Sequence, residues 1–439
     1  MKKRKITAKA VPILLGAILV TALCGCGKKA VSEQTPVSTG QGNSTGDLQE
    51  NKSECLQENK TEGAQENGSE QEPDKTTENV GNTGNTDRED STVTPKITPE
   101  VSLSAVVLQE IRETGADVVD TTKVPYTYSE MCEDLLLLEQ LYPEIISVDW
   151  AGYSVDRRPI PAVTFGNPAA EQTIFVQASI HARESLTTLL VMKQLEQYAK
   201  DYETGNYGGR SYREIFSEVA LLIVPMTNPD GVSISQLGPE SIRSDELRAL
   251  VESFYERDGN GLGRSYFFSR YKANANGVDL NRNFAYGWDE YVGVKTPAAD
   301  HYKGTEPASE PETQLLIELT KKSGAVAAVS YHATGSVLYW DFGQTGELRE
   351  RCLSLVNLVH NLTGYQISYA ATDRQDEAGY CEWAVGIHGI PEVTIEVGTV
   401  AAPLPISEFR GVWEHNREVL AAIAYKYLVE AKRAGYLQK

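Results

Sequence analysis

Two potential metal ligands, His181 and Glu184, lie one helical turn apart directly after an apolar run. That run, residues 173–180, has the composition of a buried strand, and a helical pattern follows the motif. A strand that ends in a turn into a helix presents side chains at the carboxyl edge of a sheet, where open α/β sheets bind their ligands. The pair therefore indicates a zinc site, although a strand-end histidine near a surface glutamate would give the same pattern.

The segments around this motif alternate between strand-like and helix-like patterns. The expected strands are residues 147–150, 160–165, 173–180, 221–225, 325–331 and 393–397. The expected helices are residues 128–142, 185–200, 312–322, 348–362 and 412–433. This alternation predicts an α/β fold with a mixed, mostly parallel central sheet flanked by helices. A longer excursion between residues 224 and 281 is expected to shape a pocket mouth or to be a tolerated insertion.

The first 26 residues resemble a bacterial lipoprotein signal peptide. A basic start, residues 1–5, precedes an apolar run at about 11–22 that is too short to span a bilayer comfortably. A small residue precedes Cys26, which the resemblance makes the lipidated first residue of the mature chain. We therefore expect an exported protein anchored on the extracytoplasmic face of a membrane. A plain secreted protein or a signal anchor is the alternative.

Residues 27–120 are predicted to form a disordered acidic spacer. Their composition is dominated, up to about residue 100, by Glu, Gln, Asn, Thr, Ser and Gly, with few large apolar side chains. Such a segment buries too little surface to offset its chain entropy. The remainder, residues 121–439, is expected to fold as one catalytic domain.

The charge and the cysteines narrow the class of protein further. The chain has a formal net charge of −20 and no Lys/Arg stripe, so nucleic acid is not an expected partner. Three of the six cysteines, Cys132, Cys352 and Cys381, fall in the folded part. Their spacing shows neither a disulfide framework nor a cysteine-based zinc motif, so buried free thiols are expected by default.

Five motifs in this order resemble the M14 family of zinc carboxypeptidases, over about residues 126–426. They are HARE at 181–184, TNPDG at 227–231, GVDLNRNF at 277–284, SYH at 330–332 and TIEVG at 394–398. Each motif alone is a weak signal, but five in the family's order are hard to produce by chance. The resemblance implies a metallocarboxypeptidase with one Zn²⁺ per chain.

The metal ligands implied for this zinc are His181, Glu184 and His332. A catalytic zinc takes three such protein ligands and leaves a fourth position open. The other four histidines fit surface or packing roles better, because of the helices, loop and turn in which they are expected; they are His301, His360, His388 and His415.

The resemblance also assigns the remaining roles. Glu396 corresponds to the general base, which takes a proton from the attacking water and passes it to the leaving amine. Asn281 and Arg282 correspond to the pair that holds the substrate's terminal carboxylate. Arg270 is the candidate that polarises the scissile carbonyl, and Lys272 is the alternative. Arg183 is also expected to face the site.

Two departures from the family pattern concern specificity. Many members carry a mobile tyrosine over the site, and here Tyr369 and Tyr380 are both possible. The position that selects the substrate side chain falls near Cys381 and Glu382, which match neither an apolar floor nor plainly an acidic one.

The pattern around residues 272–281 and 396–405 resembles the bacterial branch that cleaves γ-D-glutamyl-diaminopimelate bonds in cell-wall peptides. The expected substrate is therefore a muropeptide, cleaved at an amide bond next to a free carboxylate. A broad extracellular carboxypeptidase acting on ordinary peptides is the alternative. A non-catalytic lipoprotein that binds peptides in the same pocket is the alternative of another class, and a purely structural surface protein would leave the five motifs unexplained.

Overall fold

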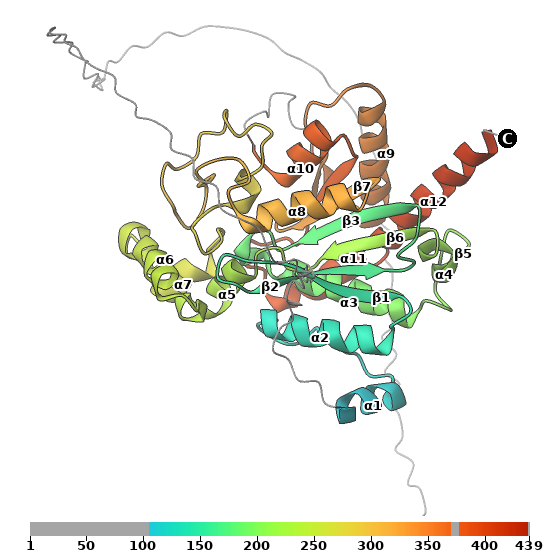
Figure 1. Cartoon of the computed structure of the whole chain (residues 1–439), viewed down its shortest axis with the longest axis horizontal. Coiled ribbons are helices and arrows are strands. Elements are labelled where there is room, and N and C mark those ends of the chain that lie inside the picture. Colours follow the sequence, from blue (N-terminus) through green and yellow to red (C-terminus); the bar gives the residue numbers. More distant parts are fainter. Residues whose placement is uncertain (1–104, 370–376, 438–439) are drawn as a thin grey trace, which may run out of the picture. The chain divides into compact units, whose positions relative to one another are not determined.

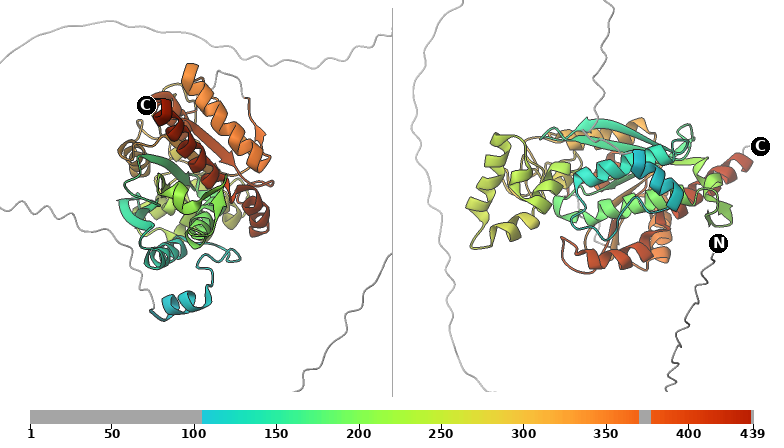
Figure 2. Two further views of the ribbon diagram at one scale, coloured as in Figure 1. Left: turned by 90° about the vertical axis from the view of Figure 1, so that its right-hand side faces the viewer. Right: turned by 90° about the horizontal axis from the view of Figure 1, so that it is seen from below.

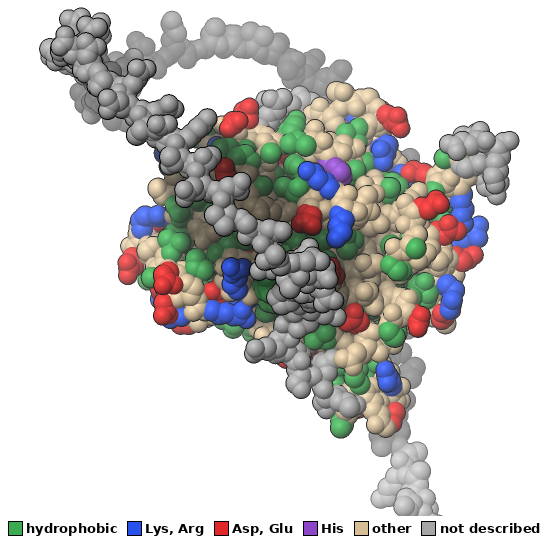
Figure 3. All heavy atoms as spheres, viewed as in Figure 1, with side chains coloured by type: hydrophobic (Ala, Val, Ile, Leu, Met, Phe, Trp, Pro, Cys, Tyr) green, Lys and Arg blue, Asp and Glu red, His purple; other side chains and the backbone are tan. Residues whose placement is uncertain are grey.

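The structure is a computed structural model that describes residues 105–369 and 377–437. The predicted signal peptide, the lipidation candidate Cys26 and most of the predicted spacer lie outside the described residues. Within the described ranges no helix is both long and apolar enough to cross a membrane. On the face drawn in Figure 3, Lys and Arg side chains lie among Asp and Glu side chains rather than in one stripe.

The main sheet has eight strands in the order β1-β2-β6-β3-β7-β10-β8-β9. Their bounds are β1 (Ile146–Tyr153), β2 (Pro159–Phe165), β3 (Gln172–Ala178), β6 (Val219–Val224), β7 (Ala327–His332), β8 (Val337–Tyr339), β9 (Gln366–Ile367) and β10 (Glu392–Glu396). A small separate hairpin is formed by β4 (Asn206–Tyr207) and β5 (Arg210–Ser211).

Four adjacent strands, β6, β3, β7 and β10, run parallel to one another at the centre of the sheet. The strands on either side of this group, β2 and β8, are antiparallel to it. The sheet is therefore mixed and mostly parallel at its centre, as predicted, and the carboxyl ends of the four central strands share one edge.

The helices cover both faces of this sheet (Figure 1). Their bounds are α1 (Ala105–Thr114), α2 (Tyr128–Leu141), α3 (Leu186–Lys200), α4 (Tyr212–Phe216), α5 (Pro229–Leu237), α6 (Asp245–Asp258), α7 (Arg264–Ser269), α8 (Pro311–Lys322), α9 (Gly346–Thr363), α10 (Tyr380–Trp383), α11 (Phe409–Asn416) and α12 (Val419–Leu437). One face packs against α2, α3, α9, α11 and α12, and the other packs against α8 and α10. Figure 2 shows α9 and α12 lying side by side.

Strand β3 shows how the sequence builds these layers. Because successive strand side chains point to opposite faces, Ile174 and Val176 pack in the α3 layer while Phe175 packs in the α8 layer. All three side chains are fully buried. An apolar run without alternation is what a strand buried on both faces requires.

The predicted start of the folded domain at residue 121 is too late. Helix α1 lies within the range assigned to the spacer, and Val119 is buried in the main core. The backbone N–H groups of Val118 and Val119 donate to the carboxylate of Glu196 on α3. These bonds attach the segment to the domain.

The single helix predicted for residues 412–433 is two helices, α11 and α12. The Gln194 side chain donates to the carbonyl of Asn416, and the Tyr198 hydroxyl donates to the carbonyl of Arg417. Both donors belong to α3, a distant part of the sequence. A helix ends where its carbonyls find other partners, so local periodicity could not predict this break.

Cys132, Cys352 and Cys381 are buried free thiols, which confirms the default expectation. The excursion predicted between residues 224 and 281 contains α5, α6 and α7. These helices form a third hydrophobic cluster beside the sheet, centred on Phe254 and Phe268.

Candidate metal and catalytic site

The predicted ligands and base meet where three neighbouring parallel strands end. His181 follows β3, His332 is the last residue of β7, and Glu396 is the last residue of β10. Glu396 and His332 are register partners, and Ala178 of β3 pairs with Tyr331 beside them. Parallel strands present their carboxyl ends at one edge, which explains how residues 181, 332 and 396 come together.

His181, Glu184 and His332 form the only group of three His, Cys, Asp or Glu residues suited to a metal among the residues that the structure describes. Their ligand atoms all lie within 4.8 Å of one another, and all three residues are buried. The two Nδ1 atoms are 3.2 Å apart, and Glu184 approaches them at 2.8 Å and 3.0 Å. Two nitrogens bound tetrahedrally to one Zn²⁺ would be about 3.3 Å apart. The donor set and its spacing therefore fit zinc.

The protonation states of two of the three ligands, His181 and Glu184, suit metal binding. Burial lowers the pKa of His181, which favours the neutral imidazole that a metal requires. Burial opposes ionisation of Glu184, but the adjacent His181 and His332 hold the pKa of this carboxyl well below its ordinary value. The same carboxylate accepts the backbone N–H of Ala333 at 3.1 Å. Burial acts to lower the pKa of His332, but the adjacent Glu184 carboxylate raises it, so a metal must displace a proton from His332.

Asp279 supports His181 from behind, a role to which the sequence analysis assigned no residue. Asp279 Oδ1 and His181 Nε2 are buried, lack hydrogen-bond partners and face each other at 3.5 Å. Oδ2 of Asp279 contacts Lys272 Nζ at 2.9 Å. Although burial acts to raise it, the pKa of Asp279 is held well below the ordinary range by Lys272 and His181. A carboxylate behind a ligating histidine fixes the ring and raises its basicity.

Replacing Asp279 with asparagine is therefore expected to weaken zinc binding about 10- to 100-fold. The measurement is a zinc titration in competition with a chromogenic chelator. Asp300→Asn is the matched control, because the Asp300 carboxylate contacts His301 rather than a metal ligand. An unchanged zinc affinity in Asp279→Asn would remove Asp279 from the metal site.

The turn that presents His181 is held by buried polar side chains. Ser179 has a positive φ of 49°, and its hydroxyl bonds to Thr188 Oγ1 at 2.7 Å. The Asn228 side chain, from the TNPDG motif, donates to the carbonyls of Ile180 and Ala273. These contacts secure the strained turn, and Asn228 joins it to the loop that follows Lys272.

Glu396 lies beside the metal ligands without being one of them. Its side chain is partly buried, and this loss of solvation raises the pKa of Glu396 to about 7, although nearby His332 acts to lower it. A general base works best when its pKa lies near the operating pH. The position and pKa of this carboxyl therefore suit proton transfer.

The active-site pocket has a volume of about 380 Å³. Its lining includes all but one of the predicted metal, catalytic and substrate-binding residues, namely His181, Arg183, Glu184, Lys272, Asn281, Arg282, His332 and Glu396. At the end of the pocket predicted to bind a carboxylate, Asn281 Oδ1 accepts the backbone N–H of Tyr380. Arg282 contributes a buried Nε without a hydrogen-bond partner, and its guanidinium lies 5.2 Å from the centre of the Tyr291 ring.

Arg270 is the predicted residue that lies elsewhere. Its guanidinium is 5.8 Å from the centre of the Tyr266 ring, and it lines a neighbouring pocket rather than the one around the ligands. Position 270 follows α7 directly, whereas Lys272 lies in the loop that bonds to the zinc motif through Ala182 N–H. The geometry therefore favours Lys272, the alternative that the sequence offered, as the residue that polarises the scissile carbonyl.

The specificity region is acidic in the structure. Glu377, Cys381 and Glu382 line the pocket, and Glu377 lies 3.7 Å from Arg282. Burial raises the pKa of Glu382 to about 7. Its carboxylate accepts the Cys381 thiol at 2.9 Å and the Gly379 N–H at 3.1 Å.

The two tyrosine candidates for a mobile cover differ. Tyr380 is fully buried and its hydroxyl bonds to Thr320, so it is a core residue and not a cover. Tyr369 is 71% exposed and contacts Trp340 edge-on. Residues 370–376, which follow it, lie outside the described residues.

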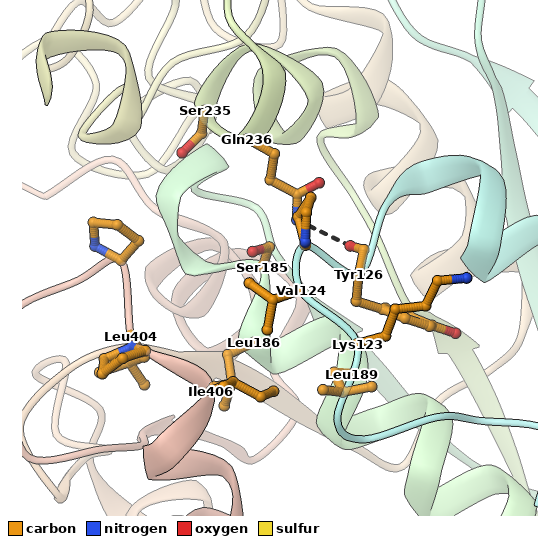
Figure 4. Close-up of a pocket in the computed structure, with 13 residues that line it drawn as sticks. Lys123, Val124, Tyr126, Ser185, Leu186, Leu189, Ser235, Gln236, Leu404 and Ile406 are labelled. Atoms are coloured by element: carbon orange, nitrogen blue, oxygen red, sulfur yellow. Dashed lines mark hydrogen bonds between the residues drawn. The ribbon is translucent and has the colours of Figure 1, made fainter. Parts of the chain in front are cut away.

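A separate pocket of about 270 Å³ lies beside the start of α3 (Figure 4). Much of its lining is apolar, with Leu186, Leu189, Leu404 and Ile406, and Gln236 bonds across one wall to the Tyr126 carbonyl. None of the ligand, base or anchor candidates lines it.

Comparison with known proteins agrees with this geometry. The model of the Peptidase M14 family, described as zinc carboxypeptidase, matches residues 131–419. The γ-D-glutamyl-L-diamino acid endopeptidase 1 of Lysinibacillus sphaericus is 31% identical over 304 residues, which cover 68% of this chain and 72% of the relative. Carboxypeptidase B of Astacus astacus is 26% identical over 321 residues, which cover 68% of this chain and 95% of the relative.

The solved structure of bovine thrombin-activatable fibrinolysis inhibitor, in complex with tick carboxypeptidase inhibitor, shares the fold at 17% identity. Its TM-score is 0.53 over 69% of this chain and 97% of that chain.

Proposed function

The chain belongs to the M14 zinc carboxypeptidase family and is a hydrolase, and from this premise we propose that it acts on cell-wall peptides. The proposed reaction is hydrolysis of the amide bond between the γ-carboxyl of D-glutamate and a diamino acid that carries a free carboxylate. The ligands proposed for the zinc are His181, Glu184 and His332.

His181, Glu184 and His332 would hold a zinc ion, which would supply a Lewis acid for the scissile carbonyl and would make the attacking water more acidic. Glu396 takes one proton from that water while the water oxygen bonds to the carbonyl carbon. The carbon–nitrogen bond then breaks, and Glu396 delivers the proton to the leaving amine. The carboxylate base is thereby regenerated, and the Lys272 ammonium stabilises the negative charge that develops on the carbonyl oxygen.

The leaving residue is proposed to bind between Asn281, Arg282 and the acidic floor. The Arg282 guanidinium offers a planar pair of donors for its carboxylate.

The main observation in favour of a diamino acid as the leaving residue is a pair of carboxyl groups in the pocket that holds Arg282. They belong to Glu377 and Glu382. A buried carboxyl is costly beside an apolar side chain but is compensated by an ammonium group. A diamino acid brings a carboxylate for Arg282 and a second amine for Glu382.

Two further observations support this proposal. The endopeptidase of Lysinibacillus sphaericus, whose name specifies a γ-D-glutamyl-L-diamino acid bond, is 31% identical. The sequence also predicts an exported lipoprotein attached at Cys26, and such a protein would meet cell-wall peptides outside the cytoplasmic membrane. Export and anchoring remain part of the proposal.

The test incubates the zinc-loaded protein with L-alanyl-γ-D-glutamyl-meso-diaminopimelate and with linear peptides ending in Lys, Phe or Asp. Mass spectrometry is expected to show release of diaminopimelate from the γ-linked peptide. Cleavage of the linear peptides alone would favour the broad carboxypeptidase instead. Binding of the γ-linked peptide without cleavage of any substrate would favour a non-catalytic peptide-binding protein.

Glu382→Gln is expected to lower kcat/KM for the diamino substrate about 10- to 100-fold, the effect of losing one charged hydrogen bond. Because the pKa of Glu382 is about 7, the carboxyl is neutral below that pH and ionised above it. The KM of wild type for this substrate should therefore fall as pH rises from 6 to 8, and Glu382→Gln should lose that part of the dependence.

The control compares each enzyme on the diamino peptide and on a γ-glutamyl peptide with an apolar leaving residue. A folding defect lowers both rates, whereas loss of ammonium recognition lowers only the first. Glu414→Gln, on α11, is the control variant with an exposed glutamate. Equal losses on both peptides would contradict the role given to Glu382.

A further inference from the structure

A second pocket of about 460 Å³ adjoins the active site and has three arginines in its lining. They are Arg183, Arg257 and Arg270. Arg183 lines both pockets, so it forms a shared wall between the catalytic centre and this second space. The rest of the lining comes mainly from α6, α7 and the loop at residues 294–300.

Two of these arginines have no ion-pair partner among the described residues. Arg257 pairs with Asp258 at 2.6 Å, so its charge is already compensated. Among the residues described, Arg183 and Arg270 have no carboxylate within ion-pair distance. Arg183 also has a buried Nε without a hydrogen-bond partner, and its Nη1 donates only weakly, at 3.3 Å, to the Arg270 carbonyl.

The remaining acidic residue of the lining, Asp300, offsets only part of the positive charge of the arginines. Its carboxylate contacts His301 at 3.3 Å. This contact lowers the pKa of Asp300, although burial acts to raise it. Three guanidinium groups therefore share the lining with two carboxylates, so the pocket keeps a net positive charge in a chain whose net charge is −20. Guanidinium groups in one pocket repel one another, and binding of an anion would reduce that cost.

The position of the pocket tells which part of a substrate would reach it. Asn281 and Arg282 line the active-site pocket but not the second pocket. The leaving residue, which they are proposed to hold, therefore binds away from the second pocket. A substrate bound across the metal ligands must continue on its acyl side, and the wall there is Arg183.

We propose that Arg183 and Arg270 form an acyl-side anion subsite, which binds a carboxylate on the residue that donates the scissile carbonyl. This inference rests on the proposed function for its natural ligand. A γ-linked glutamate keeps its α-carboxylate free, close to the scissile bond, whereas an ordinary α-linked residue has none there. Guanidinium groups bind carboxylates with two parallel hydrogen bonds, so the subsite selects γ-linked over α-linked bonds.

The test uses three substrates that differ only at this carboxylate. The γ-D-glutamyl residue of the peptide carries a free α-carboxylate, an α-carboxamide, or hydrogen in its place as a 4-aminobutyryl residue. Wild type is expected to prefer the free carboxylate by about 10- to 100-fold in kcat/KM. Arg270→Met should lose most of that preference, and Arg270→Lys should restore part of it.

Arg257→Met is the matched control, because Arg257 lines the same pocket with its charge paired to Asp258. It should retain the wild-type preference. The subsite is overturned if wild type cleaves all three peptides equally well, or if Arg270→Met lowers all three rates by the same factor. A mere structural effect of residue 270 would produce the second result.

Failure of the proposed function would be recognised separately, as absence of cleavage of every γ-linked peptide. The subsite is then tested with α-linked peptides that carry Glu or Gln immediately before the leaving residue. A preference for Glu that Arg270→Met abolishes supports the subsite, and its absence overturns it.

Discussion

Replacing Glu396 with glutamine is expected to lower kcat about 10²- to 10⁴-fold while zinc remains bound. Glutamine has nearly the same shape but cannot accept the proton of the attacking water. Glu396 is not one of the three clustered metal ligands, so the zinc content should stay at one per chain. The measurement pairs steady-state hydrolysis of the γ-linked peptide with metal analysis of the same preparation.

The control for Glu396→Gln is Glu414→Gln, which changes an exposed carboxylate on another element. Thermal unfolding of both variants checks that the fold is intact. If Glu396→Gln turned the substrate over at the wild-type rate, proton transfer by this residue would be excluded. Loss of zinc from the variant would instead mean that Glu396 helps to hold the metal.

Replacing His332 with alanine is expected to remove both zinc and activity. The variant lacks one of three converging donors, whereas loss of a supporting residue alone typically weakens metal binding 10- to 100-fold. We therefore expect zinc affinity to fall by more than about 100-fold. Since a ligand that binds only the folded state stabilises it, added zinc should raise the unfolding temperature of wild type but not of the variant.

His415→Ala is the matched histidine control, because His415 is exposed and lies outside the clustered ligands. It should keep its zinc, its activity and its thermal response to zinc. A His332→Ala protein that still bound one zinc with wild-type affinity would contradict the assigned ligand set.

The sequence predicted the central sheet because its strands are buried on both faces. Runs such as Ile174–Val176 contain little but large apolar residues, and a polar ligand or base lies at or just after the end of each of the strands that form the site. Parallel neighbours then bring His181, His332 and Glu396 to one edge. Their meeting also requires the observed strand order, which the sequence patterns did not predict.

Features that depend on tertiary contacts were predicted less well. The choice between Arg270 and Lys272 depends on the path of the loop after α7, which is fixed by bonds from the backbone N–H groups of residues 272 and 273 to Ala299. The break between α11 and α12 depends on side chains of α3. Neither partner is close in the sequence.

The role of Asp279 had a signal in the sequence that was not used. It lies within the GVDLNRNF motif, two residues before Asn281, and a buried carboxylate there requires a charged or hydrogen-bonding partner. The structure supplies Lys272 as that partner and places His181 beside it.

The most direct test of a zinc-dependent hydrolase is a titration of metal-free protein with zinc, followed by cleavage of L-alanyl-γ-D-glutamyl-meso-diaminopimelate. Turnover is expected to be absent after chelation and to rise linearly until one zinc is bound per chain. Full turnover by the metal-free protein would contradict zinc dependence.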